Sequence, residues 1–114
     1  MQLHPSVETA YLKLNNQENY PAILEYNLDD LAQECHLSPV RLSRLFHAQI
    51  GTTLILYRNQ KRLEYFQQIY SSSPHLTISE AAFSAGFGSY AQFQKSFIKA
   101  FGYSPKSFKD KVRR

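Results

Sequence analysis

Apolar residues recur along most of the chain with the period of an amphipathic α-helix. Leu45 and Phe46 follow Leu42 by three and four residues, and Phe97 follows Phe93 by four. Almost no segment has the strict alternation of apolar and polar residues that is typical of a β-strand. The pattern therefore predicts an all-α protein.

Residues that favour helix ends divide this pattern into separate helices. Ser38-Pro39 and Ser104-Pro105 each place a capping serine before a proline at the first helical position. Residues Thr77 to Glu80 fit a capping box, and Gly51 and Gly102 stand where helices are expected to end. We expect seven helices, at residues 5–15, 28–35, 39–50, 53–71, 78–85, 90–101 and 105–112, with loops at 15–21 and 71–75.

Two segments of the chain, residues 28–53 and 78–104, follow the same pattern. Each begins with a short helix, passes through a tight turn that carries an apolar residue, Leu37 or Phe87, and continues into a second helix. The repeat predicts two helix-turn-helix subdomains joined by a long connecting helix. We expect three parts: an N-terminal helix and loop (1–23), the first subdomain with the connecting helix (24–71) and the second subdomain (72–114).

The turn of each copy needs one residue with a left-handed backbone. Gly86 holds that position in the second copy, and His36 holds it in the first, where a side chain adopts positive φ at some cost. A plain helical bundle with tight turns is the alternative that the periodicity alone leaves open.

The second helix of each copy has an outer face that suits the groove of a duplex. Small, polar and basic side chains dominate it: Val40, Arg41, Ser43, Arg44 and His47 in the first copy, and Tyr90, Ala91, Gln94 and Lys95 in the second. Arg44 can pair bidentately with guanine, whereas Lys95, a point charge, also suits a phosphate. A phosphate contact is the alternative for Arg44.

The charge of the chain is unevenly distributed. Residues 1–34 contain one basic and six acidic residues, whereas residues 35–114 contain twelve basic and three acidic ones, within a net charge of +4. The basic part predicts an anionic partner, most often a nucleic acid, and a merely solvated basic surface is the alternative.

Several classes of function lack a sequence signal. Cys35 is the single cysteine, so it cannot form an internal disulfide, and the spacing typical of a zinc site does not occur. The sequence has neither a Gly-rich nucleotide-binding loop nor a Ser, His and acid pattern for hydrolysis. It also has no apolar run long enough to span a bilayer and no signal peptide pattern. We therefore expect a cytoplasmic protein that is not an enzyme and uses no metal or cofactor.

Motifs in both copies resemble the DNA-binding domain of the AraC/XylS family of bacterial transcription regulators, over roughly residues 24–112. The first is the run from Leu37-Ser38 to Arg44-Leu45-Phe46, and the second comprises Gly86-Phe87 and the run from Phe101-Gly102 to Pro105. Phe66 departs from the family, which has alanine there, and this raises a question about local packing. Since residues 1–23 are too few for an effector domain, we expect an excised domain or a single-domain member.

The resemblance implies a sequence-specific transcription regulator, more often an activator, that places two recognition helices in successive major-groove segments of double-stranded DNA. It also implies RNA polymerase as a partner of the parent regulator and association with the nucleoid when bound. The internal duplication predicts a monomer. A helix-turn-helix repeat that binds other proteins without binding specific DNA is the alternative function.

Other residues are expected to hold the DNA backbone or to build the scaffold. Candidate phosphate contacts, with helix capping as the alternative for most, are Ser38, Thr53, Ser89, Gln92, Ser104 and Lys106. In the connecting helix, about 27 Å long at 1.5 Å per residue, we expect burial of Leu56, Leu63, Phe66 and Ile69. Candidates to approach phosphates are Arg58, Lys61 and Arg62, and at least one of them is expected instead to pair with Glu64 or to lie in solvent.

Overall fold

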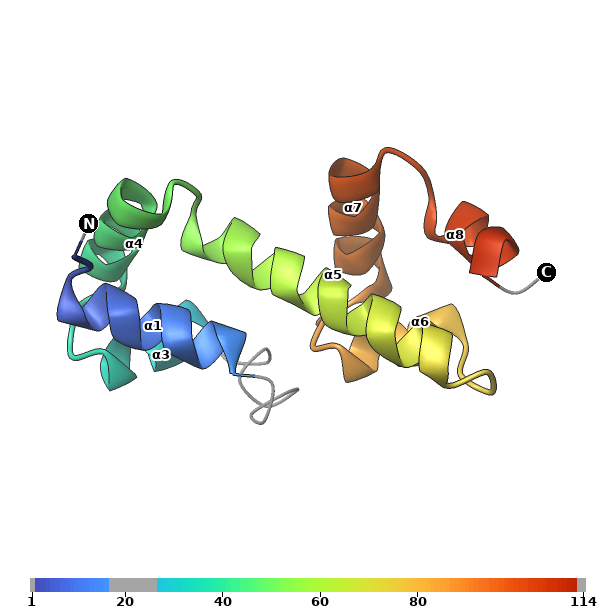
Figure 1. Ribbon diagram of the computed structural model, residues 1–114, viewed down its shortest axis with the longest axis horizontal. Coiled ribbons are helices and arrows are strands. Elements are labelled where there is room, and N and C mark those ends of the chain that lie inside the picture. Colours follow the sequence, from blue (N-terminus) through green and yellow to red (C-terminus); the bar gives the residue numbers. More distant parts are fainter. Residues whose placement is uncertain (1, 17–26, 113–114) are drawn as a thin grey trace. The chain divides into compact units, whose positions relative to one another are not determined.

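The computed structural model describes residues 2–16 and 27–112, and within them the chain is helical without strands. Figure 1 shows the order of the elements. The helices are α1 (Pro5–Asn15), α3 (Leu28–Glu34), α4 (Pro39–Ile50), α5 (Leu54–Ser72), α6 (Ile78–Ser84), α7 (Tyr90–Phe101) and α8 (Pro105–Val112). The prediction of an all-α fold is confirmed, and the seven helices expected from the sequence are all present in the described residues.

Four of the predicted helices have the expected bounds, α3 and α6 end one residue earlier than expected, and α5 begins and ends one residue later. The predicted loop at 71–75 is wrong in its first two residues, because α5 continues through Ser72. Of the predicted loop at 15–21, Asn15 ends α1, and residues 17–21 lie outside the described part of the chain.

The chain divides into two compact units, residues 1–58 and 59–114. Because the division falls inside α5, the first residues of this helix belong to unit 1 and the rest belong to unit 2. The domain boundaries after residues 23 and 71 remain a prediction.

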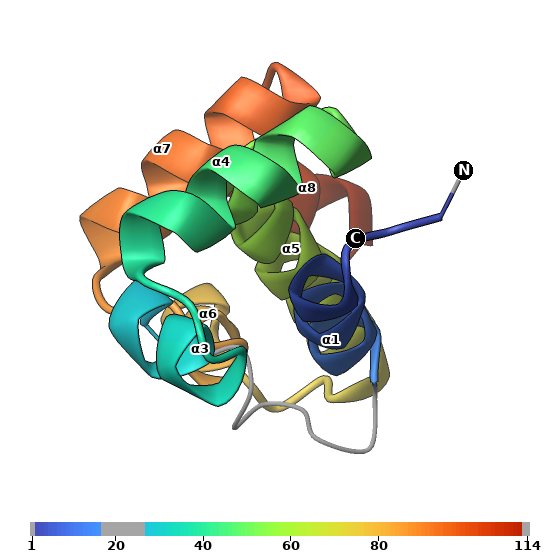
Figure 2. The ribbon, with the colours of Figure 1, turned by 90° about the vertical axis from the view of Figure 1, so that its left-hand side faces the viewer.

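In unit 1, α4 packs against both α1 and α3, the helices nearest the viewer in Figure 2. Leu42 and Phe46 of α4 are fully buried. The ring of Tyr57, from the start of α5, lies 5.5 Å from that of Phe46 and 5.7 Å from that of Tyr11, measured between centroids. An aromatic cluster therefore joins three helices of this unit.

Polar contacts also hold α1 in place. The backbone N–H of His4 donates to the side-chain oxygen of Gln49 at 2.8 Å, and the hydroxyl of Ser6 donates to the carbonyl of Cys35 at 2.8 Å. Lys13 forms an ion pair with Glu34 at 2.6 Å. These contacts attach α1 to the end of α4 and to the end of α3.

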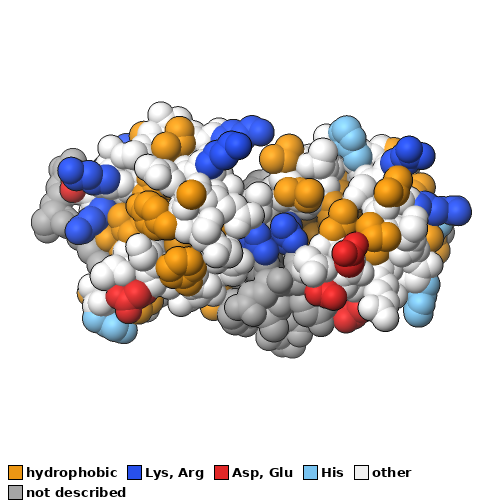
Figure 3. All heavy atoms as spheres, turned by 180° about the vertical axis from the view of Figure 1, so that it is seen from behind, with side chains coloured by type: hydrophobic (Ala, Val, Ile, Leu, Met, Phe, Trp, Pro, Cys, Tyr) orange, Lys and Arg blue, Asp and Glu red, His pale blue; other side chains and the backbone are white. Residues whose placement is uncertain are grey.

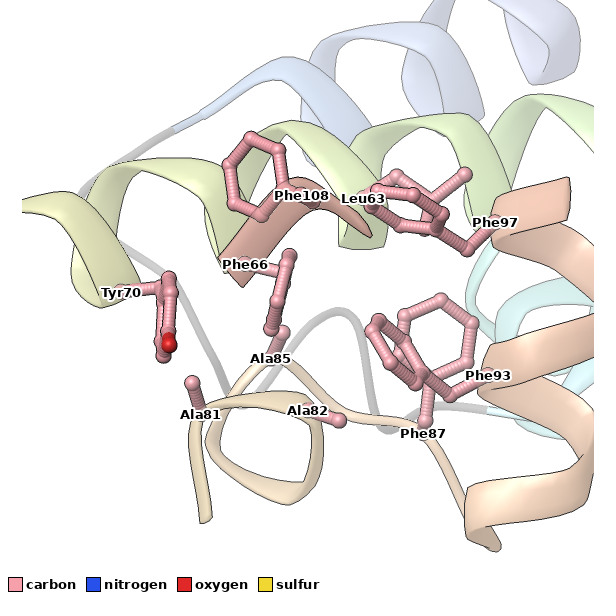
Figure 4. Packing of buried hydrophobic residues seen from close by; sticks show 10 residues of the cluster. All are labelled: Leu63, Phe66, Tyr70, Ala81, Ala82, Ala85, Phe87, Phe93, Phe97 and Phe108. Carbon is pink, nitrogen blue, oxygen red and sulfur yellow. The ribbon is translucent and has the colours of Figure 1, made fainter. Parts of the chain in front are cut away.

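The core of unit 2 is largely aromatic (Figure 4). Its buried residues come from four helices and one turn: Leu63, Phe66, Tyr70, Ala81, Ala82, Ala85, Phe87, Phe93, Phe97 and Phe108. The three alanines lie on α6 and at its end, where the absence of a large side chain leaves room for the neighbouring rings. Small residues on the short helix thus complement large residues on its neighbours.

Phe66 lies at the centre of this core. It is fully buried, and its ring centroid lies 4.7 Å from that of Phe93 and 5.5 Å from that of Tyr70. Phe97 and Phe108 also contact it, at 6.0 and 5.9 Å. The bulk that departs from the family pattern is therefore accommodated, because the ring fills the space between α5, α7 and α8.

The expectation for the start of α5 is wrong at one position. Leu56 is 44% exposed, whereas Leu54, two residues earlier, is 4% exposed. Leu63 and Phe66 are buried as expected, and Ile69 is partly buried against the unit 2 core. The apolar face is rotated at the start of α5 because there the helix packs within unit 1.

Candidate nucleic-acid interface

Helix α4, which the sequence predicts to be the first recognition helix, is fixed at both ends by local interactions. Ser38 caps it, since its hydroxyl oxygen accepts from the backbone N–H of Arg41 at 3.2 Å, and Pro39 occupies the first turn. Gly51 ends it with φ of +92°, and its N–H donates to the carbonyl of His47. The burial of Leu42 and Phe46 then fixes the rotation of the helix about its axis.

This rotation leaves the predicted base-reading side chains on the open face of α4. Val40, Arg41, Arg44 and His47 are exposed, and Ser43 is half-buried. Val40 is an apolar side chain with 61% of its surface accessible. An exposed apolar group on the same helix as two exposed arginines suits contact with a thymine methyl beside polar base edges.

Helix α7, the second predicted recognition helix, is built in the same way. Ser89 caps it by accepting from the N–H of Gln92 at 3.1 Å, and Gly102 ends it with φ of +79°. Phe93 and Phe97 are fully buried, whereas Phe101 is only partly buried. The predicted outer residues are all exposed: Tyr90, Ala91, Gln94 and Lys95.

The turns that precede the two recognition helices have matching geometry. His36 has φ of +59° and Gly86 has φ of +100°, so both copies use the left-handed backbone that the sequence predicts. The N–H of Leu37 donates to the carbonyl of Ala32 at 3.1 Å, and the N–H of Phe87 donates to that of Ala82 at 3.3 Å. The internal repeat in the sequence is therefore also a repeat of backbone hydrogen bonds.

The serine and threonine side chains considered for phosphate binding act as helix caps. Besides Ser38 and Ser89, Thr53 accepts from the N–H of Leu56 at 3.1 Å, and Ser104 accepts from the N–H of Ser107 at 3.2 Å. Their contact with phosphate remains a prediction.

The last two phosphate candidates lie close to such caps. Lys106 is exposed in the first turn of α8. Gln92 accepts from the N–H of Gly88 at 3.2 Å, so it reaches the turn rather than completing a capping box with Ser89. Contact of Lys106 and Gln92 with phosphate also remains a prediction.

The expectation that Arg62 approaches phosphates is wrong. Its side chain is only 4% exposed, its guanidinium carbon lies 5.6 Å from the centroid of the Phe87 ring, and its Nη1 donates to the side-chain oxygen of Asn59 at 3.2 Å. Lys61 instead pairs with Glu64 at 3.3 Å. Arg58 is half-buried, and burial lowers the pKa of its guanidinium.

Further basic side chains, which the sequence pattern did not single out, lie on the surface of unit 2. Lys99 is exposed in the last turn of α7, and Lys109 is exposed on α8. The ammonium of Lys111 lies 4.2 Å from the centroid of the Tyr103 ring, a cation–π contact. Lys109 and Lys111 could have been identified from the sequence, because they follow the Ser104-Pro105 helix start at positions within the predicted helix.

The surface carries apolar as well as basic groups. Figure 3 shows hydrophobic side chains exposed between the Lys and Arg side chains on one face. Half-exposed examples are Ile55 on α5 and Phe83 on α6.

Neither a thiol with a lowered pKa nor a metal-binding cluster is found among the described residues. Cys35 is buried at the end of α3, and burial raises the pKa of its thiol, so the reactive thiolate is disfavoured. Within residues 2–16 and 27–112, no three His, Cys, Asp or Glu side chains are arranged to hold a metal ion. In the same residues no helix is both long and apolar enough to cross a membrane.

A sequence family described as a helix-turn-helix domain matches residues 31–111. The chain belongs to the AraC-type helix-turn-helix family. This family consists of transcription regulators rather than enzymes, as the sequence predicted.

Two curated relatives of the AraC type come from Escherichia coli. The chain is 30% identical over 108 residues to the arabinose operon regulatory protein, a match that covers 94% of this chain and 37% of that protein. It is 30% identical over 90 residues to the transcriptional activator RclR, covering 77% of this chain and 31% of the relative. The chain thus spans about a third of the length of these relatives.

Solved AraC-type structures share the fold. The C-terminal domain of AraT, a response regulator from Geobacillus stearothermophilus, superposes with a TM-score of 0.80 at 26% identity, covering 97% of this chain and 88% of that domain. The DNA-binding domain of AdpA, solved in complex with a target DNA, superposes with a TM-score of 0.76 at 21% identity. This match covers 96% of the present chain and 93% of the AdpA domain. At this identity, the similarity to AdpA shows a shared fold only.

Proposed function

We propose that this chain is the DNA-binding part of a transcription regulator, which reads a double-stranded site by placing α4 and α7 in major grooves. One observation carries the proposal: both helix-turn-helix copies fix the second helix by a cap, a buried apolar stripe and a terminal glycine, and leave small, polar and basic side chains exposed. A helix of about 10 to 12 Å diameter fits the major groove.

In this proposal each exposed side chain has a role set by its chemistry. Arg44 pairs with the two acceptors of guanine, and Val40 contacts a thymine methyl, while Ser43 donates to or accepts from a base edge. On α7, Gln94 pairs with adenine and Lys95 holds a phosphate. Arg41, His47, Tyr90 and Ala91 complete the two reading faces.

The names of the relatives support a role in transcription. RclR is a transcriptional activator by name, and the arabinose protein is an operon regulator. We infer for the parent of this chain activation of transcription in the cytoplasm, on nucleoid DNA, through contact with RNA polymerase. The observation that favours a protein partner in addition to DNA is the adjacent pair Ile55 and Leu56, which are about half exposed at the start of α5.

The test is a binding-site selection from random duplexes, followed by salt titrations of binding to the selected sequence. We expect a defined motif and an affinity that falls steeply with salt, because each phosphate contact releases about 0.9 of a counterion. If the selection yields no motif, or if the affinity does not change with salt concentration, the proposal is contradicted and the protein-interaction module is favoured. Sedimentation of the complex tests stoichiometry, for which we expect one chain on a minimal site.

A further inference from the structure

The two units carry opposite net charges. Unit 1, residues 1–58, contains four basic and six acidic residues, and unit 2, residues 59–114, contains nine basic and three acidic ones. Their net charges are therefore −2 and +6. If both units meet the same polyanion, the attraction is concentrated on unit 2.

The surface chemistry of the described residues makes this difference larger. In unit 1 the exposed basic side chains are Arg41 and Arg44, both on the recognition helix, whereas Lys13 is held in its ion pair with Glu34. Asp29 and Asp30 are exposed in the first turn of α3. Unit 1 therefore offers two exposed guanidinium groups, and its exposed carboxylates repel phosphate.

Unit 2 has the opposite chemistry. Among its described residues, the exposed basic side chains are all lysines, at Lys95, Lys99, Lys106, Lys109 and Lys111. None of the first four forms an ion pair with a described residue. The one described arginine of the unit, Arg62, is buried against Phe87.

The acidic residues of unit 2 leave these lysines largely accessible to an anion. The carboxylate of Glu80 completes the capping box of α6 by accepting from the N–H of Thr77 at 3.1 Å, and Glu64 pairs with Lys61. Asp110 is exposed beside Lys109 and partly offsets the charge of α8.

Arginine and lysine suit different parts of a duplex. The planar guanidinium matches the paired acceptors of guanine, whereas the ammonium is a point charge that suits a phosphate without selecting a base. We propose that the two units divide DNA recognition: the lysines of unit 2 hold the phosphate backbone, and the arginines of α4 in unit 1 supply most of the sequence preference. This inference rests on the proposed function.

The experiment compares two charge-removing variants of the full chain on the selected duplex. The triple variant Lys99→Gln, Lys106→Gln and Lys109→Gln should lower the slope of log K against log salt by about 0.9 for each phosphate that the protein no longer neutralises. Its selected motif should stay the same. The double variant Arg41→Gln and Arg44→Gln should lose much of its preference for that motif over random duplex while changing the slope less.

Lys61→Gln is the matched control, because it removes one positive charge from unit 2 at a site already paired with Glu64. We expect its slope and motif to equal those of the wild type. All three lysines of the triple variant are exposed, so thermal unfolding should stay unchanged and should separate a binding effect from a folding effect.

Four outcomes would count against the inference. An unchanged slope in the triple variant, or an altered motif in it, would overturn the division between the units. A larger decrease in slope from the arginine pair than from the three lysines would overturn it as well. If the wild type itself binds no duplex in a salt-dependent way, the proposed function fails and this inference fails with it.

Discussion

Replacing Phe66 with alanine should test the aromatic core that positions α7. The side chain is fully buried, and four rings lie within 6.0 Å of it between centroids, from α5, α7 and α8. Truncation of a buried phenylalanine to alanine costs about 3–5 kcal/mol. We expect the upper part of that range, because three helices border the site and cannot all move inward to fill the cavity.

Such a loss is large against the total stability of a small protein, which is about 5–15 kcal/mol. The assay is chemical denaturation followed by far-ultraviolet circular dichroism, with the free energy of unfolding extrapolated to water. Phe83→Ala is the matched control, since it removes the same ring from a position that is 49% exposed on α6. We expect it to change the free energy of unfolding by about 0.5 kcal/mol or less.

A loss below about 1 kcal/mol for Phe66→Ala would refute this reasoning, because the value would be too small for a ring buried among four others. Equal losses for the two phenylalanine variants would refute it too, since burial distinguishes them.

Three further predictions concern base reading, backbone conformation and pH. Arg44→Ala should cost about 1–3 kcal/mol of binding free energy on the selected site and should relax the sequence preference at one or two base pairs. Lys95→Ala should weaken binding to all sequences evenly and lower the slope of log K against log salt by about one. A selected motif that is unchanged after Arg44→Ala would assign Arg44 to a phosphate contact. Gly102→Ala should lower the free energy of unfolding by about 1–2 kcal/mol in the same denaturation assay, because φ of Gly102 is +79°. The space around an added Cβ is open there, so the loss would come from the backbone conformation alone. Gly88→Ala is the control, because Gly88 has no positive φ. Hydrogen bonds from the backbone and side chain of Thr77 hold the pKa of Glu80 below its ordinary value, so their contribution to stability is present at neutral pH and is lost as the pH falls through that lowered pKa. Unfolding measured across this range should show the loss in the wild type and not in Glu80→Gln, which keeps the accepting oxygen; identical pH profiles would contradict this cause.

The helices and their ends could be predicted from the sequence because their causes are local. Ser38, Ser89 and Thr77 each accept from an N–H three residues ahead, and Gly51 and Gly102 end helices at positive φ. These interactions form within one turn of the chain, so the residue types identify them without knowledge of the rest of the fold. The outer faces of α4 and α7 followed from the same information, since the apolar stripe specifies which side is buried.

Whether a single side chain on α5 is buried or exposed depends on the residues that pack against it. Arg62 looks like a surface base in the sequence, yet it is buried on Phe87, and Leu56 looks like a core residue, yet it is 44% exposed. The helix contributes to two units, so its buried face changes along its length, and a single helical period cannot describe both parts. Arg62 and Leu56 mark where that period fails.

The sequence by itself thus determined the repeat, the helices of the described residues and the exposed basic faces, because periodicity and capping act over a few residues. Only the tertiary structure decided that Phe66 fills the centre of an aromatic core and that the exposed cations of the described chain separate into arginines in unit 1 and lysines in unit 2. Burial and ion pairing join residues far apart in the chain, and these interactions determine which charges are exposed.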